Sequence, residues 1–299
     1  MVNSEENNDN ESSSDKKTKD NSLIEEDDWQ LPLDFNLIAQ HEKETIVLPD
    51  GSTFFVQCVE SLTPLDMMNL SSGNHDATGH CVWTGAFVLI AALEIVQDLT
   101  ARPLHILELG CGTGIGGIAM LAAKQPAAHV CFTDSDPEAL SLCRRNCELN
   151  QLSDYSIEQV TWGEGLPTSI QPRKFNVVLA TDVLYDIGLL KPLFTTAKDS
   201  LETQSVSTTA EVTAGQIDRH FVLSHVPRAC FNSKHPPPGH CTLQEYIIQQ
   251  AKLYGFHLES TVRPSDLKDF VTPPVHAFNH SVCLEELEQI GAAIFVFRL

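Results

Sequence analysis

Residues 105–114 read HILELGCGTG, and this stretch decides the fold of the chain. The apolar residues Ile106, Leu107 and Leu109 predict a short buried strand, and the glycines after it predict a tight turn. From Ile115 onward apolar residues return at helical spacing, so the turn opens a helix. Glycine leaves no Cβ between the main chain and a ligand, and a strand, turn and helix in this order are typical of cofactor sites. The stretch therefore indicates a cofactor.

Two cofactors compete for this glycine turn. Residues 112–117 satisfy the G-x-G-x-x-G pattern of dinucleotide-binding proteins, and Asp134 follows at a suitable distance for a ribose hydroxyl. The register favours another cofactor, because the first glycine is Gly110 and the strand carries the acid Glu108 near its carboxyl end. That carboxylate would repel the pyrophosphate of NAD and attract the ammonium and sulfonium of S-adenosylmethionine (SAM). The sequence thus favours SAM, and a structural turn without a ligand is the third alternative.

Length and composition predict a single globular protein that is soluble and cytoplasmic or nuclear. The 299 residues, 42% of them hydrophobic, suffice for one sizeable core. No apolar run reaches the length of a membrane span, and the N-terminus lacks the apolar region of a signal peptide. The nine cysteines form no C-x-x-C pair, so reduced thiols are expected rather than disulfides.

The net charge of −21 bears on the partners. Residues 1–28 contribute −7 of it, and this acidic tail, taken to residue 30, is predicted to be disordered. The remaining −14 disfavours a nucleic-acid substrate, because phosphate binding needs a basic surface. It favours a basic partner, such as a lysine-bearing segment of another protein. No membrane partner is expected.

Two parts follow the tail. Residues 31–100 are expected to form an N-terminal unit that packs on the core at 101–299. In it, residues 45–56 predict a β-hairpin across Asp50-Gly51, and residues 86–96 predict an apolar helix. The core begins with alternating strands and helices, which indicates an α/β fold with parallel strands and crossover helices. The strands are predicted at 104–109, 130–133, 157–160, 175–180 and 220–225, and the helices at 115–124, 136–149, 186–201 and 242–254.

The C-terminal part departs from this alternation. Residues 256–262 and 292–297 predict two more strands with no regular helix between them, which indicates a mostly parallel sheet with an antiparallel C-terminal strand. Residues 202–219 and 264–290 are predicted to be loop insertions.

The run from Thr78 to Asp186 resembles the class I SAM-dependent methyltransferases, which have a Rossmann-like seven-stranded sheet. More narrowly it resembles the protein-lysine branch known as methyltransferase family 16. The matching pieces are Trp83, Glu108 to Gly114, Phe132-Thr133-Asp134, Val160-Thr161-Trp162, and Val178 to Tyr185 with its Asp182-x-x-Tyr185 spacing. The resemblance implies SAM as the cofactor and a lysine side chain of a protein as the acceptor.

The expected cofactor site begins at the glycine turn. Gly110, Cys111 and Gly112 are expected to hold the methionyl part of SAM with backbone amides, and Glu108 to lie near its ammonium. Asp134 ends the next strand, so its carboxylate is expected to bind the ribose hydroxyls. The alternatives are an ordinary tight turn and, for Asp134, a cap for the helix that follows.

The remaining predicted site residues follow later strands or precede the core. Trp162 and Trp83 are expected to contact the cofactor, with buried core tryptophans as the alternative, and Thr181 is expected to give a backbone contact. In the implied architecture Asp182 would hold a lysine ammonium and Tyr185 would form a wall or supply a hydroxyl; a helix cap and a core aromatic are the alternatives. The amine must lose its proton before it attacks, so positioning and desolvation would be the main catalytic effects.

Three further possibilities concern metal binding, the acceptor and turnover. The segment from His225 to Cys241 holds histidines and cysteines, but their irregular spacing around Pro236-Pro237-Pro238 matches no zinc pattern, so no metal is expected. The acceptor could instead be a histidine side chain or a small molecule. The chain could also bind SAM as an interaction module without turnover.

Overall fold

The computed structural model describes residues 41–59, 77–99, 103–170, 175–202, 218–227, 239, 241–267 and 283–299. The acidic tail at 1–30 lies outside these ranges, as do most of the two predicted insertions. The segment from His225 to Cys241, which was considered for metal binding, also lies largely outside these ranges, at 228–238 and 240. Within the described ranges, no helix is both long and apolar enough to cross a membrane.

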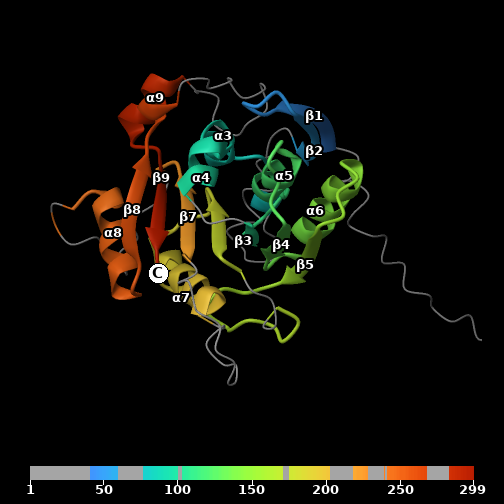
Figure 1. Cartoon of the computed structure of the whole chain (residues 1–299). Coiled ribbons are helices and arrows are strands. Elements are labelled where there is room, and N and C mark those ends of the chain that lie inside the picture. The colour runs from blue at the N-terminus through green and yellow to red at the C-terminus, as the bar shows by residue number, and fades with distance from the viewer. Residues whose placement is uncertain are drawn as a thin grey trace, which may run out of the picture.

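A seven-stranded sheet forms the centre of the structure, in the order β5-β4-β3-β6-β7-β9-β8 (Figure 1). Its first five strands along the chain run parallel. They are β3 (His105–Leu109), β4 (His129–Asp134), β5 (Tyr155–Gln159), β6 (Val177–Thr181) and β7 (His220–His225). The parallel pairing confirms the predicted mostly parallel sheet. All five strands also begin and end within about two residues of the ranges predicted from apolar runs.

The antiparallel strand predicted at the C-terminus is β9 (Ala293–Arg298). It lies between β7 and β8 (His257–Val262) and is antiparallel to both, so the sheet ends with β8 and not with the antiparallel strand. A short helix, α9 (Leu284–Ile290), precedes β9, so the prediction of no regular helix here is wrong. Only Leu287 of this helix is buried, and one buried position produces no apolar period in the sequence.

Helices cover both faces of the sheet, because its central strands are apolar on both sides. Ile106 packs with residues of α3 to α6, whereas the next residue, Leu107, packs with residues of α7 and α8. The helices are α3 (Thr84–Ala91), α4 (Leu93–Leu99), α5 (Ile115–Ala122), α6 (Pro137–Leu149), α7 (Leu190–Glu202) and α8 (Leu243–Leu253).

Two helices differ from their predictions. The helix predicted at 86–96 is two helices, α3 and α4, because the Ala92 amide also bonds the Leu89 carbonyl and tightens the turn between them. The helix predicted at 186–201 begins as a 3₁₀ turn, η2 (Ile187–Leu189), before α7 starts.

The predicted N-terminal hairpin is confirmed and is longer than expected. Strands β1 (His41–Val47) and β2 (Thr53–Val59) pair antiparallel around the Asp50-Gly51 turn. Figure 1 shows the hairpin beside α5 and α6, far from α8. The buried side chains of Phe54 and Val56 belong to the same core as those of α5 and α6, so the hairpin packs on the helices that flank the glycine turn.

Candidate active site

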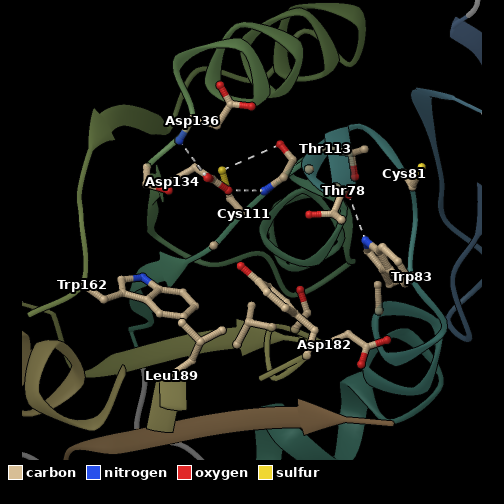
Figure 2. A pocket seen from close by; sticks show the side chains of 18 of the residues that line it. Thr78, Cys81, Trp83, Cys111, Thr113, Asp134, Asp136, Trp162, Asp182 and Leu189 are labelled. Atoms are coloured by element: carbon tan, nitrogen blue, oxygen red, sulfur yellow. Dashed lines mark hydrogen bonds between the residues drawn. The ribbon is translucent and has the colours of Figure 1, made fainter. Parts of the chain in front are cut away.

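A pocket of about 260 Å³ opens at the carboxyl ends of β3 to β6, where parallel sheets of this kind bind ligands. The stretch from the 3₁₀ turn η1 (Ala77–His80) into α3 completes its wall. Figure 2 shows the side chains converging on one space. Nine of the ten predicted site residues line it: Trp83, Gly110, Cys111, Gly112, Asp134, Trp162, Thr181, Asp182 and Tyr185. Glu108 is the exception.

The glycine turn has a backbone shape that glycine adopts readily. The φ angle is +69° at Gly110 and +49° at Gly112. A Cβ on Gly110 would lie 2.9 Å from the Val183 side chain and 3.0 Å from the Trp162 ring, so the absence of a side chain lets the main chain touch the pocket walls. The Gly112 amide donates a hydrogen bond to Asp134 Oδ2 at 3.0 Å. The turn is therefore fixed to the end of β4.

Two aspartates near the end of β4 have different roles: Asp134 is its last residue, and Asp136 follows it. Asp134 is half-buried at the strand end, where its Oδ1 accepts a hydrogen bond from the Asp136 amide at 3.1 Å. Asp136 is the N-cap of α6, because its Oδ1 accepts from the Glu138 amide at 2.9 Å. The helix-cap alternative considered for Asp134 thus belongs to Asp136. Asp136 also lines the pocket, although the sequence reasoning did not include it among the site residues.

Glu108 lies behind the glycine turn and not in the pocket. Its side chain is fully buried, and Oε2 accepts a hydrogen bond from the Gly117 amide in the first turn of α5 at 3.0 Å. Burial raises the pKa of Glu108 to about 8, because the charged form loses its water and only part of that loss is offset by the bond from Gly117. Glu108 thus supports the turn from behind, and its expected place near the cofactor ammonium stays a prediction.

Asp182 is fixed by backbone amides on both sides. Its Oδ2 accepts from the Gly85 amide at 2.8 Å and its Oδ1 from the Val226 amide at 3.2 Å. The residue has φ of +60°, a conformation that Asp tolerates better than most residues. The helix-cap alternative considered for Asp182 applies to α3, because Asp182 bonds the Gly85 amide in the first turn of that helix. The η2 turn that follows Asp182 in the chain is capped by Asp186.

Aromatic side chains border the pocket on different sides. Figure 2 shows Trp83 and Trp162 across the space from each other. The Trp83 indole donates to the Thr78 carbonyl at 2.9 Å, which fixes its ring at the start of α3. Both indoles are only partly buried, so neither is an ordinary core tryptophan. Tyr185 is 52% exposed at the pocket, so the core-aromatic alternative is wrong for it.

Cys111 is the buried thiol of the glycine turn. It lies close to Cys143 of α6, and burial raises the pKa of Cys111 to about 12. The thiol is therefore neutral at physiological pH and unreactive as a nucleophile. None of the eight cysteines in the described part of the chain forms a disulfide.

The charge of the pocket is one-sided. Among the described lining residues are the carboxylates of Asp134, Asp136 and Asp182, and no lysine or arginine. Such a lining favours a cationic ligand and opposes the two phosphates of a dinucleotide. The glycine turn, the acid at the end of β4 and the indole of Trp162 fit the methionyl, ribose and adenine parts of SAM. The residues present therefore fit SAM better than NAD.

Comparison with known proteins finds methyltransferases among the sequences similar to this chain. The family model described as "Lysine methyltransferase" matches residues 62–224. The ribosomal protein L11 methyltransferase of Geobacter sulfurreducens is 28% identical over 55% of this chain and 49% of its own length. The histone-arginine methyltransferase METTL23 of Xenopus laevis is 34% identical over 36% of this chain and 45% of its own. The protein-lysine N-methyltransferase EEF2KMT of Mus musculus is 32% identical, over 38% and 36% respectively. The chain spans about half or less of each relative.

Proposed function

The chain belongs to the lysine methyltransferase family, and from this premise we propose that it transfers a methyl group from SAM to a lysine side chain of a protein. SAM is the cofactor of this family. One observation carries the proposal: the glycine turn and the Asp182-x-x-Tyr185 segment line the same acidic pocket. Cofactor and acceptor residues would therefore meet in one space, as a direct transfer requires.

The cofactor end of the pocket is formed by residues after β3, β4 and β5. Gly110 and Gly112 would hold the methionyl part with their backbone, supported by the buried Cys111. Asp134 would accept hydrogen bonds from the ribose, and Trp162 would flank the adenine. Trp83 and Thr181 line the same pocket and would complete the contacts to the cofactor. When bound, SAM supplies an electrophilic methyl group on a sulfonium.

The acceptor end is formed by Asp182 and Tyr185. The two backbone amides that Asp182 accepts from hold its negative charge in one place, where it would attract an incoming lysine ammonium. The exposed ring of Tyr185 would guide the lysine stem at the mouth. The lysine Nζ must release a proton to solvent before its lone pair attacks the methyl carbon. The residues therefore act by positioning and desolvation.

The charge of the whole chain supports a protein acceptor. At −21 the protein would attract a basic segment, and the three pocket carboxylates extend that preference to the site itself. A neutral small molecule would not be attracted by this negative charge. We therefore propose a protein substrate whose lysine lies in a basic segment.

The proposal is tested by incubating the full chain with a cell lysate and SAM labelled on its methyl group. Wild-type protein is expected to place the label in acid-precipitable protein, and an Asp134→Asn variant is expected to transfer much less. Label confined to small molecules would replace the protein acceptor with a metabolite. Binding of SAM without transfer in any lysate fraction would support an interaction module instead of an enzyme.

A further inference from the structure

Two asparagines, Asn146 of α6 and its C-cap residue Asn150, bind the outer edge of the N-terminal hairpin. Asn146 accepts from the Gln57 amide at 2.7 Å and donates to the Gln57 carbonyl at 3.0 Å. Asn150 does the same to Phe55, with distances of 2.7 Å and 2.6 Å. Each side-chain amide thus pairs with one residue of β2 as a neighbouring strand would. The edge of β2 that faces away from β1 is covered by a helix.

The spacing of the two elements explains this pairing. Residues four apart on a helix are about 6 Å apart along its axis and on one face. Residues two apart on a strand are about 6.8 Å apart and share one edge. The two spacings are therefore nearly equal, so Asn146 lies opposite Gln57 and Asn150 lies opposite Phe55, with the helix and the strand running in opposite directions. The hairpin is held in a fixed register against α6.

Asn146 makes one bond that Asn150 does not. Its Nδ2 also donates to the carbonyl of Thr113, inside the glycine turn, at 2.8 Å. The second donor of Asn150 stays within α6, on the Asn146 carbonyl at 2.7 Å. Asn146 is fully buried and uses its acceptor and both donors, so its amide has a single orientation. It joins the hairpin to the turn.

We propose that Asn146 is a positioning residue for the cofactor, and that the N-terminal hairpin acts on the cofactor site through it. Thr113 stands between Gly112 and Gly114, both of which have positive φ. The Gly112 amide is held by Asp134, and the Thr113 carbonyl is held by Asn146. The bond from Asn146 holds the Thr113 carbonyl, and thereby the neighbouring amides, in the binding shape. The inference rests on the cofactor part of the proposed function and not on the identity of the acceptor.

The test compares Asn146→Ala with Asn150→Ala in the full chain, using S-adenosylhomocysteine as the probe in isothermal titration calorimetry. Both variants lose two bonds to the hairpin and should have a lower melting temperature. Only Asn146→Ala loses the bond to Thr113, so its affinity should fall about threefold to tenfold. In turnover assays KM for SAM should rise in this variant with kcat unchanged, and Asn150→Ala should keep the wild-type KM.

The outcomes separate the possible explanations. Equal affinities for the two variants would overturn the inference and leave the proposed function intact. A wild-type protein that does not bind S-adenosylhomocysteine would overturn the cofactor part of the function, and the inference with it. If Asn146→Ala fails to fold, the pair Asn146→Ser and Asn150→Ser gives the same comparison without a buried charge. A loss of affinity confined to Asn146→Ser would support the inference, and equal affinities would overturn it.

Discussion

Asp182 Oδ2 accepts a hydrogen bond from the Gly85 amide at 2.8 Å, although the two residues are 97 positions apart in the chain. Ser224 strengthens this junction, because its hydroxyl donates to the Gly85 carbonyl and its own carbonyl accepts from the Asp182 amide. A Cβ on Gly85 would lie 2.7 Å from Asp182, so a glycine at this position permits the contact. Asp182, the residue proposed to attract the substrate lysine, therefore also fixes the start of α3. Its structural and chemical roles need separate variants.

Asp182→Asn removes the negative charge at a smaller structural cost than alanine. Asparagine tolerates positive φ and keeps the shape, but its single acceptor oxygen can bond only one of the two amides, Gly85 and Val226, that Asp182 binds. We expect kcat for lysine methylation to fall at least about tenfold, and the affinity for S-adenosylhomocysteine to stay within about threefold. Asp182→Ala should also lower the free energy of unfolding by about 2–4 kcal/mol, because it leaves two amides unpaired and strains the backbone. Steady-state kinetics and urea unfolding check both. Unchanged kcat in Asp182→Asn, measured beside the capping control Asp186→Asn, would exclude the acceptor role.

Asp134 and Asp136 form a second matched pair. Asp134→Asn should weaken S-adenosylhomocysteine binding about tenfold or more. A charge-assisted bond to the ribose is lost, and the single acceptor oxygen can bond only one of the amides of Gly112 and Asp136. Asp136→Ala should instead cost about 1 kcal/mol of stability through loss of the α6 cap, with a smaller effect on binding. Calorimetry and thermal unfolding of both variants check this. The reverse order of binding losses would move the ribose contact to Asp136.

Gly110→Ala should abolish measurable cofactor binding. The added methyl group would meet Val183 and Trp162 at about 3 Å, and φ is +69°. Gly165→Ala is the matched control, because Gly165 also has positive φ, +88°, but no atom within 4 Å of its Cβ position. The control should lose about 1 kcal/mol of stability and keep its affinity. Equal affinities for both variants would show that the turn does not approach the cofactor.

Glu108 makes stability depend on pH. Its pKa is about 8 in the folded protein, against 4.5 for an ordinary glutamate. Between these values the folded protein holds a proton that the unfolded chain has released, so the free energy of unfolding falls as pH rises, by about 1.4 kcal/mol per pH unit. Below pH 4.5 the contribution is fully present. Glu108→Gln removes this titration, so the stability of the variant relative to wild type should rise from pH 5 to 8. Parallel urea-unfolding profiles would contradict the raised pKa.

The sequence predicts the sheet and most of the pocket because those features are local. Apolar runs mark β3 to β7, and the strand ends place Asp134 and Thr181 at one edge of the sheet. The burial of Glu108 behind the turn depends on its neighbours in space. Gly116 and Gly117 are the sequence signal for it: without Cβ atoms, the first turn of α5 has room for the Glu108 carboxyl group.

Other contacts have no local signal. The partners of Asp182 are the amides of Gly85 and Val226, which are distant in sequence and brought together by the order of strands in the sheet. The same holds for Asn146, whose pairing with Gln57 spans 89 positions and depends on the helix and strand spacings coinciding. Such bonds follow from tertiary packing, so propensity and periodicity alone cannot predict them.

Tandem mass spectrometry of the protein that the full chain labels in a lysate with methyl-labelled SAM tests the proposed lysine transfer. We expect the label on the Nζ of a lysine in a basic segment, and we expect Asp182→Asn to remove it while S-adenosylhomocysteine still binds. Label on arginine or histidine side chains alone, or undiminished labelling by Asp182→Asn, would rule out lysine transfer that depends on Asp182.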